Sequence, residues 1–545
     1  MRGLMMDKPL LISSLLDYAA KYHGDTEIVS RTVEGPIHRY TYADAESRSK
    51  KLAKALHALG IEEGDRVATL AWNGFRHYEL YYGVSGMGAI CHMINPRLFA
   101  AQVAYIMNHA EDMLVFADLT FLSLLEEIAP DVGTVKGFVI MTDEANMPET
   151  ALPNVYCYET LLAVQDDDYD WPQFDEFTAS SMCYSSGTTG NPKGVLYSHR
   201  STVLHAWAAA TPDMLGIAAR DTVLPVVPMF HVNAWGMPYT ATMVGAKLVF
   251  PGPQMDGESI HDLINDEGVT FSAGVPTVWL GLLDYLEKSG KKVPSFERCV
   301  IGGSATPRAM ITEMEEKYDV HVVHAWGMTE MSPLGTANWP KNGMENETAD
   351  ERIDRRVKQG RACYGVDMKI VNDANESLPE DGKAFGELKA RGFWVCSEYY
   401  RGEGESHDAD GWFATGDVST IDPDGYMQVT DRSKDVIKSG GEWISSVVLE
   451  NTAAGCPGVA EACCIGVEHP RWQERPLLLI VREAGADVDE AAIRAYLDGK
   501  IAKWWMPDAV RFVDGLPRNG VGKVMKAVLR DEHRSVLLTE KAGSP

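Results

Sequence analysis

The stretch YSSGTTGNPKGVLYSH, residues 184–199, sets serines, threonines and glycines around a single lysine, Lys193. Small residues let backbone N–H groups converge on an anion, hydroxyl groups add donors, and the lysine adds positive charge. The spacing is not that of the G-x-x-x-x-G-K-[ST] phosphate loop, because Gly194 follows Lys193. A flexible surface loop is the alternative, which the preceding strand-like segment SSMCY (residues 180–184) and Pro192 disfavour. We therefore expect a phosphate-binding loop of another type.

Strand-like apolar segments that end in glycine or proline alternate with helical patterns on both sides of this stretch. Examples are residues 65–74 and 113–120 before it, and residues 222–232, 298–307 and 319–330 after it. Such alternation is typical of layered α/β sheets. Ligands bind at the carboxyl ends of the strands in these sheets, so we expect the site there.

The pattern changes near residue 365 to short strands with close turns, which indicates a small antiparallel β subdomain. A last segment begins near residues 431–445 and predicts a small α+β domain, with helices near 446–455 and 489–503. The predicted fold class is thus α/β plus α+β, with a large layered N-terminal domain and a small C-terminal one.

The composition limits the class of partner. The 545 residues include 78 acidic and 50 basic side chains, for a formal net charge of -28. This charge disfavours nucleic acid or an anionic membrane as a partner, and an anionic substrate would need a local cationic pocket. Nine scattered cysteines without a C-x-x-C pair indicate reduced thiols in the cytoplasm. No uncharged apolar run of about 18 residues occurs, so we expect no membrane span.

Seven motifs in fixed order resemble those of the adenylate-forming superfamily, which includes acyl-CoA synthetases, peptide-synthetase adenylation domains and luciferases. The opening stretch is the first. The others are PMFHVNAWG (228–236), GGSATP (302–307), HAWGMTE (324–330), GWFATGD (411–417), DRSKDVIKSGGEWIS (431–445) and PRNGVGK (517–523). Residues 223–236 and 438–445 are most similar to bacterial medium- and long-chain fatty acid–CoA ligases and to methylmercaptopropionate–CoA ligases.

The resemblance implies a two-step reaction and a mobile C-terminal domain. A carboxylate attacks the α-phosphate of ATP to give an acyl-adenylate and pyrophosphate, and the thiol of coenzyme A then displaces AMP. The expected cofactors are ATP and Mg²⁺, with coenzyme A as co-substrate and a small carboxylic acid as partner. The implied domains are 1–431, which binds acid and ATP, a hinge at 432–434, and a mobile domain at 435–545. A homodimer is common among such relatives.

The resemblance also assigns residues to the nucleotide. The β- and γ-phosphates would lie on Ser185, Ser186, Gly187, Thr188, Thr189, Gly190 and Lys193, although the family usually has Thr in place of Ser185. Glu330 would hold Mg²⁺ with Ser185; taken alone, Glu330 is an ordinary surface carboxylate. The adenine pocket would comprise Gly303, Ser304, His324, Ala325 and Trp326, with core packing as the alternative for Trp326. Thr329, beside Glu330, would also bind the nucleotide. Asp417 and Arg432 would bind the ribose, and a turn aspartate is the alternative for Asp417.

Further residues are assigned to catalysis, the hinge and the acid. Lys523 would bridge the substrate carboxylate and the α-phosphate during adenylation. Lys434 would be the pivot for the domain rotation. His231 and Trp235, with Gly303, would face the acyl group, and simple core packing is the alternative for this segment. The segment around Gly440 and Gly441 would line the thiol path, Trp443 would contact nucleotide or coenzyme A, and Lys438 is assigned to cofactor binding.

A medium-chain fatty acid is the first substrate hypothesis, and a short thioether acid such as methylmercaptopropionate, or a branched acid, is the second. A stand-alone adenylation enzyme that loads an acyl carrier protein is an alternative within the same class. A non-catalytic nucleotide- or acyl-CoA-binding protein is the alternative from another class. The presence of Lys523, Glu330 and Asp417 disfavours the latter.

Overall fold

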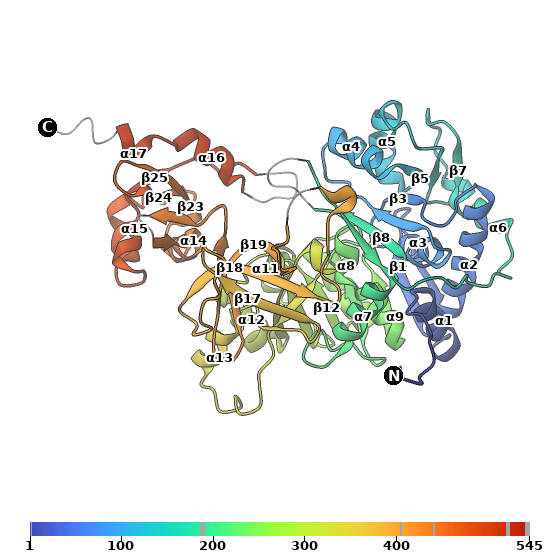
Figure 1. Ribbon diagram of the computed structural model, residues 1–545, viewed down its shortest axis with the longest axis horizontal. Helices are drawn as coiled ribbons and strands as arrows, with labels where there is room; N and C mark the ends of the chain where they lie inside the picture. Colours follow the sequence, from blue (N-terminus) through green and yellow to red (C-terminus); the bar gives the residue numbers. More distant parts are fainter. Residues whose placement is uncertain (2, 186–190, 404–405, 440–441, 519–523, 540–545) are drawn as a thin grey trace. The chain divides into compact units, whose positions relative to one another are not determined.

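The computed structural model describes residues 1–545 except 2, 186–190, 404–405, 440–441, 519–523 and 540–545 (Figure 1). The chain forms two compact units. Unit 1 comprises Met1–Asp367 and Ala390–Phe413, and unit 2 comprises Met368–Lys389 and Ala414–Pro545. The sequence predicts a domain boundary at residue 431, about which the C-terminal domain would rotate. The division into two compact units does not test such a rotation, so this boundary stays a prediction.

The larger sheet of unit 1 has nine strands in the order β16-β15-β14-β13-β12-β10-β11-β1-β2. Its central strands are parallel, whereas β2, β15 and β16 pair antiparallel to their neighbours. The central strands are buried and almost uniformly apolar, as expected for parallel strands covered by helices. The strands are β1 (Glu27–Arg31), β2 (Ile37–Thr41), β10 (Thr222–Pro225), β11 (Lys247–Phe250), β12 (Phe271–Gly274), β13 (Arg298–Ile301), β14 (His321–Gly327), β15 (Leu334–Ala337) and β16 (Arg361–Ala362).

The second sheet of unit 1 has seven strands in the order β7-β6-β5-β3-β4-β8-β9. All pairs are parallel except β8–β9, which forms an antiparallel hairpin at one edge. β8 is therefore paired antiparallel with the next strand in the sequence. The strands are β3 (Arg66–Leu70), β4 (Ile90–Met93), β5 (Asp112–Ala117), β6 (Gly137–Ile140), β7 (Val155–Cys157), β8 (Ala179–Tyr184) and β9 (Gly194–Ser198).

Helices connect and cover these two sheets (Figure 1). The amphipathic helix α10, for example, buries Ile260, Leu263 and Ile264 in the same apolar core as Trp279 of α11. The helices of unit 1 are α1 (Ser13–Tyr22), α2 (Tyr42–Ala58), α3 (Phe75–Gly86), α4 (Ala100–Ala110), α5 (Leu122–Ile128), α6 (Tyr158–Ala163), α7 (His199–Ala210), α8 (Val232–Trp235), α9 (Met237–Val244), α10 (Gly257–Glu267), α11 (Pro276–Ser289), α12 (Arg308–Tyr318) and α13 (Ala349–Arg356).

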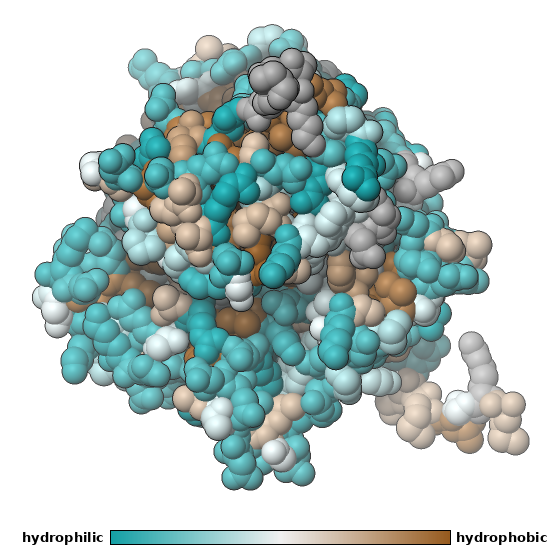
Figure 2. Space-filling model, turned by 90° about the vertical axis from the view of Figure 1, so that its left-hand side faces the viewer, coloured by the Kyte–Doolittle hydropathy of each residue, from teal (hydrophilic) through white to brown (hydrophobic). Residues whose placement is uncertain are grey.

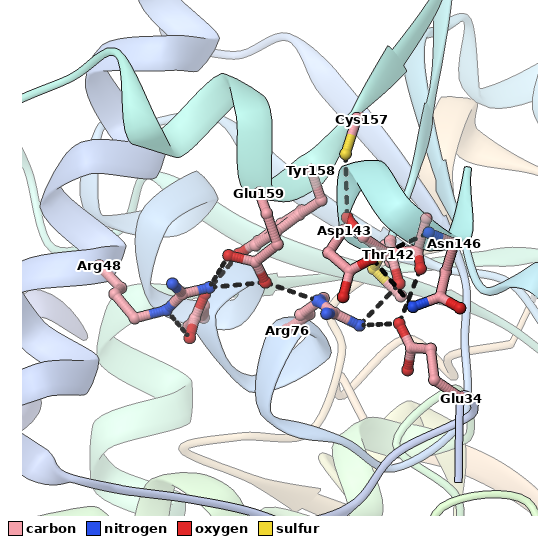
Figure 3. Close-up of polar contacts among 11 residues, drawn as sticks. Glu34, Arg48, Arg76, Thr142, Asp143, Asn146, Cys157, Tyr158 and Glu159 are labelled. Carbon is pink, nitrogen blue, oxygen red and sulfur yellow. Dashed lines mark hydrogen bonds and ion pairs between the residues drawn. The ribbon is translucent and has the colours of Figure 1, made fainter. Parts of the chain in front are cut away.

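A buried polar network joins α2, α3 and α6 (Figure 3). Glu79 is 0% exposed; its carboxylate lies 2.7 Å from Nε of Arg48 and accepts a 2.6 Å hydrogen bond from the hydroxyl of Tyr158. Glu159 then bridges Arg48 and Arg76. A buried carboxylate is costly unless it is paired and hydrogen-bonded, so removal of one partner would strongly destabilise this helical layer.

Unit 2 contains two smaller sheets. The four-stranded sheet has the order β17-β18-β19-β20, and the five-stranded sheet has the order β22-β21-β24-β23 with β25 beside β24. The elements are β17 (Val366–Val371), β18 (Phe385–Gly392), β19 (Phe413–Ile421), β20 (Met427–Arg432), β21 (Ile437–Ser439), β22 (Glu442–Ile444), β23 (Val459–His469), β24 (Gln473–Arg482), β25 (Ala509–Phe512), α14 (Ser446–Ala454), α15 (Glu490–Leu497), α16 (Lys526–His533) and α17 (Val536–Thr539).

The predicted fold class is confirmed, with one correction to an element. The helix expected over residues 489–503 ends at Leu497, because Asp498 is extended and Gly499 takes a φ of +75°. Within the described residues, none of the helices has both the length and the apolar character that a membrane crossing requires. Side chains on the face in Figure 2 are mostly hydrophilic, in keeping with the many charged residues of the sequence.

Candidate active site

The opening stretch of the sequence forms the β8–β9 hairpin. Tyr184 lies opposite Gly194 in the ladder, and the N–H of Ser185 donates a 2.8 Å hydrogen bond to the carbonyl of Lys193. Ser185 and Lys193 thus close the base of the connecting loop. The predicted phosphate-binding residues between them, Ser186, Gly187, Thr188, Thr189 and Gly190, lie outside the described residues.

Lys193 and Glu330 are brought together by a residue that the sequence reasoning missed, Tyr399. The hydroxyl of Tyr399 donates a 2.7 Å hydrogen bond to Oε1 of Glu330. The ammonium of Lys193 lies 4.7 Å from the centroid of the same ring. Burial, and next the Glu330 carboxylate, raise the pKa of Tyr399 well above its ordinary value, so the phenol keeps its proton and donates it.

A short 3₁₀ turn, Thr329–Met331, carries Glu330 directly after β14. Its main chain is held from two sides. The hydroxyl of Tyr197 donates to the carbonyl of Thr329 at 2.7 Å, and the N–H of Cys396 donates to the carbonyl of Glu330 at 2.8 Å. Since Glu330 is only 6% exposed, its carboxylate is held in place rather than free in solvent.

The donor set at Glu330 fits Mg²⁺. This ion keeps several waters and is usually held by one or two carboxylates together with substrate phosphates, not by an all-protein cage. The described residues contain no group of three or more His, Cys, Asp or Glu side chains suited to a metal ion. A single buried carboxylate near the lysine of the hairpin loop therefore suits a metal that arrives with ATP. Contact of Ser185 with the metal stays a prediction.

The glycines after β13 form a second part of the site, next to β14. Ile301 lies opposite His324 in the parallel ladder, so Gly302 and Gly303 emerge beside Ala325. A Cβ placed on Gly302 would lie 3.0 Å from the carbonyl oxygen of Ala325 and 3.1 Å from the Trp235 ring. The indole of Trp235 therefore packs closely against Gly302, where a side chain would require its neighbours to shift.

The other residues predicted to bind adenine differ in how far they are buried. Gly303 and Ser304 are exposed. His324 is buried, with Nδ1 3.0 Å from the carbonyl of Val357, and burial lowers its pKa to about 4. The ring is hence neutral, and we assign the proton to Nδ1, which donates it to Val357. His324 supports the strand end, and its part in binding adenine stays a prediction.

The ring of Trp326 packs on β15. A Cβ on Gly335 would lie 2.5 Å from carbons of the six-membered ring of Trp326. Because Gly335 has no side chain, the indole can pack closely against β15. This contact agrees with the core-packing alternative for Trp326. Contact of the indole with adenine stays a prediction.

The segment with His231 and Trp235 makes a left-handed turn that the sequence did not indicate. Five successive residues have positive φ: Val232 (46°), Asn233 (54°), Ala234 (50°), Trp235 (56°) and Gly236 (75°). For L-residues this conformation costs roughly 1–2 kcal/mol per residue, and such strain persists only where the surroundings impose it. The turn leaves His231 exposed and Trp235 half-buried, as an acyl-binding wall would require.

Asn233 anchors the turn to the hairpin strand β8. Its amide Nδ2 donates to Oγ of Ser181 at 3.2 Å, and Sγ of Cys183 lies 3.5 Å from its Oδ1. Both partners lie on the strand that leads into the phosphate loop. The predicted acid-binding and phosphate-binding segments of unit 1 therefore share one support.

Unit 2 brings together the two residues predicted to bind ribose. Asp417 on β19 and Arg432 on β20 lie opposite each other, with Nε of Arg432 2.9 Å from Oδ1 of Asp417. Lys438 lies opposite Trp443 in the β21–β22 pair, and its ammonium is 5.0 Å from the centroid of that ring. Lys434 is exposed.

The end of β20 is tied to α14 and α16 inside unit 2. Asp431 accepts hydrogen bonds from the N–H and the hydroxyl of Ser446. Lys526 donates to the same hydroxyl at 2.7 Å and lies 2.8 Å from Glu450. Lys526 follows the predicted catalytic Lys523 by three positions, so the network reaches the neighbourhood of that residue in the sequence. Lys523, Gly440 and Gly441 lie outside the described residues.

The fold and this site define an adenylate-forming enzyme. ATP-bound MatB from Rhodopseudomonas palustris, a solved structure, has a TM-score of 0.80 to this chain at 25% identity, over 96% of this chain and 99% of that one. The models for the AMP-binding enzyme family and the AMP-binding enzyme C-terminal domain match residues 16–400 and 448–523. The chain belongs to the AMP-binding enzyme family, which confirms the predicted superfamily.

Two curated relatives match the chain over nearly its whole length. 3-Methylmercaptopropionyl-CoA ligase from Ruegeria lacuscaerulensis is 53% identical over 98% of this chain and 100% of its own. Medium-chain-fatty-acid–CoA ligase from Ectopseudomonas oleovorans is 51% identical over 100% of both chains. These are the two kinds of ligase that the motifs resemble.

Proposed function

We propose that this protein is an AMP-forming acid–CoA ligase. In the first half-reaction a carboxylate oxygen bonds to the α-phosphorus of ATP, and pyrophosphate leaves. In the second, the sulfur of coenzyme A bonds to the acyl carbon, AMP leaves, and the thiol proton is released. The observation that carries the proposal is the convergence of Lys193 and Glu330 on Tyr399 beside the base of the hairpin loop.

The residues of unit 1 would act mainly on the leaving group. Lys193 and the N–H groups of the loop would bind the β- and γ-phosphates and disperse the charge that develops as the α–β bond breaks. Mg²⁺, when bound by Glu330 and Ser185, would supply further positive charge to the same phosphates. Lys523 would bring the substrate carboxylate and the α-phosphate together, which offsets the repulsion between two anions.

Residues of unit 2 would hold the rest of the nucleotide and serve the second half-reaction. The buried carboxylate of Asp417, oriented by Arg432, is suited to accept hydrogen bonds from ribose hydroxyls. Lys438 and Trp443 would border the thiol path, with Lys434 as the pivot between half-reactions. A rotation explains how Lys523 and the segment near Trp443 would serve the same reacting atoms at different times.

We propose a medium-chain fatty acid as substrate, with a short thioether acid as the second candidate. The contact of Trp235 with Gly302 provides one apolar wall at the end of β13, in keeping with an aliphatic chain. The 53% identity to a 3-methylmercaptopropionyl-CoA ligase favours the second candidate. Both acids have an apolar tail, so one wall of this kind serves either.

A cytoplasmic location and a homodimer are parts of the same proposal. The nine cysteines are all free thiols, and seven of them are buried. Such thiols suit a reducing compartment. Light scattering coupled to size-exclusion chromatography would test the dimer.

The decisive experiment is a pyrophosphate-release screen with ATP and Mg²⁺ over straight-chain acids from C4 to C16 and 3-methylmercaptopropionate. Product is identified by mass spectrometry as acyl-CoA when coenzyme A is present and as acyl-AMP when it is omitted. We expect release that depends on the acid and peaks at medium chain length. Release with none of the acids would favour a non-catalytic binding protein. Faster turnover with an acyl carrier protein than with coenzyme A would favour an adenylation enzyme.

A further inference from the structure

We propose that Tyr399 is a positioning residue that fixes Lys193 and Glu330 relative to each other, so that lysine and metal act on the same pyrophosphate group. The inference rests on the proposed function. One side chain provides both contacts: its hydroxyl bonds Oε1 of Glu330 at 2.7 Å, and its ring lies 4.7 Å from the Lys193 ammonium. None of the seven motifs includes Tyr399.

The hydroxyl contact orients the Glu330 carboxylate without neutralising its charge. An ionised carboxylate has about four lone-pair sites on two oxygens, and the phenol takes one of them. The phenol is buried, and its hydroxyl donates to Oε1 of Glu330. It therefore holds Glu330 in one rotamer before the metal–nucleotide complex arrives, which removes an ordering cost from binding.

The ring contact restrains the lysine. Lysine carries its charge on a flexible four-carbon stem, and most of that freedom must be lost when it binds phosphate. An aromatic face attracts the ammonium and provides a defined position before ATP binds. Because Lys193 and the metal are both cations, a neutral ring that contacts the lysine and bonds the metal's carboxylate can bring the two charges near each other.

The main chain that carries Tyr399 is fixed to both parts of the site. Cys396 donates from its N–H to the carbonyl of Glu330, and Ser332 donates from its hydroxyl to the carbonyl of Trp394 at 3.1 Å. On the other side, a Cβ on Gly194 would lie 3.1 Å from the Cβ of Tyr400. The segment 394–400 thus packs against the turn of Glu330 and against the stem of the phosphate hairpin.

The test compares Tyr399→Phe with Tyr399→Leu in the full-length protein. The readout is calorimetric binding of α,β-methylene-ATP, which cannot be cleaved at the α–β bond, over a series of Mg²⁺ concentrations. Tyr399→Phe keeps the ring and loses one charge-assisted hydrogen bond, so we expect the half-saturating Mg²⁺ concentration to rise about tenfold. Tyr399→Leu also loses the cation–π contact, and we expect a further loss of roughly threefold to tenfold in affinity at saturating Mg²⁺.

The matched control is Tyr197→Phe, which removes a hydroxyl that donates to the main chain of the same turn. This variant should lower the melting temperature and leave the Mg²⁺ requirement as in the wild type. An unchanged Mg²⁺ requirement in Tyr399→Phe would overturn the inference. So would a shift of the same size in Tyr197→Phe, since the effect would then be general loosening of the turn.

If Tyr399→Leu is poorly folded, a double-mutant cycle can still refute the inference. Lys193→Met is combined with Tyr399→Phe, and affinity for the same analogue is measured. Coupling between the two changes supports joint positioning, and strictly additive losses contradict it. The proposed function fails separately: the wild type would then show no acid-dependent release of pyrophosphate, whatever the behaviour of the variants.

Discussion

Asp417 and Arg432 face each other across adjacent strands, and the guanidinium Nε of Arg432 lies 2.9 Å from Oδ1 of Asp417. Asp417 is 2% exposed, whereas the side chain of Arg432 is 50% exposed. A half-exposed ion pair contributes little to stability. The pair therefore fits the proposed role of Asp417, in which Arg432 orients its carboxylate for the ribose.

Asp417→Asn should weaken ATP binding more than it weakens the fold. The amide keeps the shape but loses the charge that strengthens hydrogen bonds from ribose hydroxyls, so we expect the KM for ATP to rise about tenfold. Steady-state pyrophosphate release gives the KM, and urea unfolding gives the stability. Asp367→Asn, which removes one partner of the exposed pair with Arg391, is the control and should leave the KM unchanged. Equal KM values for the two variants would contradict a nucleotide role for Asp417.

Trp235→Ala should change which acids are used. The indole packs on Gly302 at the end of β13, and its removal opens space beside the predicted acyl site. We expect the ratio of kcat/KM for C12 to that for C6 to rise by about tenfold or more, since a buried CH₂ contributes about 0.8 kcal/mol. Trp207→Ala, a change at a 60% exposed tryptophan on α7, is the control. A chain-length ranking identical to the wild type would exclude Trp235 from the acyl site.

Gly236→Ala should destabilise unit 1 by more than its backbone conformation alone explains. Gly236 has a φ of +75°, and an added Cβ would lie 2.6 Å from Cε1 of His205. The positive φ costs about 1 kcal/mol for alanine, and the steric overlap adds about 1–3 kcal/mol. Gly268→Ala isolates the first cost, because Gly268 has a φ of +65° with nothing within 4 Å of the added Cβ. Equal urea midpoints for the two variants would show that the left-handed turn adapts freely.

The motifs named residues that the structure brings together when they are close in sequence. Ser185 and Lys193 of one motif close one hairpin, and Asp417 and Arg432 of two successive motifs are neighbours in one antiparallel pair. Tyr399 could not be predicted, since it meets Glu330 from a segment 69 positions away that carries no recognised motif. Such a contact is set by tertiary packing and not by local spacing.

The left-handed turn at Val232–Trp235 was missed for a different reason. Valine, alanine and tryptophan all disfavour positive φ, so local propensity argues against the conformation that they adopt. The tertiary anchor at Asn233 overrides that preference through Ser181. Departures from local preference are expected where a chain shapes a functional site.

Substitutions of Lys523 and Lys434 should each impair a different half-reaction. Lys523→Ala should slow formation of acyl-AMP about a thousandfold, because a cation that offsets repulsion between two anions is lost. Thioester formation from supplied acyl-AMP should survive. Lys434→Pro should show the reverse, since a fixed φ would hinder rotation at the pivot. Single-turnover assays of each half-reaction measure both; equal damage to both steps by either variant would refute the division of labour.

Asp431 should give stability a pH dependence of a particular sign. Burial, opposed chiefly by Lys526, raises the pKa of Asp431 to about 6 from the ordinary value of 3.8. Between these values the native state binds the proton more tightly than the unfolded chain, so the contribution of Asp431 to the free energy of unfolding falls as pH rises from about 4 to about 6. The fall is at most about 3 kcal/mol.

The measurement is urea unfolding of the wild type and Asp431→Asn from pH 4 to pH 7. The variant lacks this titration, so its stability relative to the wild type should improve as pH rises to about 6 and then stay constant. Asp381→Asn is the control, because backbone N–H groups of Ala384 and Lys383 hold the pKa of that carboxylate below its ordinary value of 3.8. Its titration therefore lies below this pH range, and its stability relative to the wild type should stay nearly constant from pH 4 to pH 7. A stability difference between Asp431→Asn and the wild type that does not vary with pH would show that Asp431 titrates as it does in the unfolded chain.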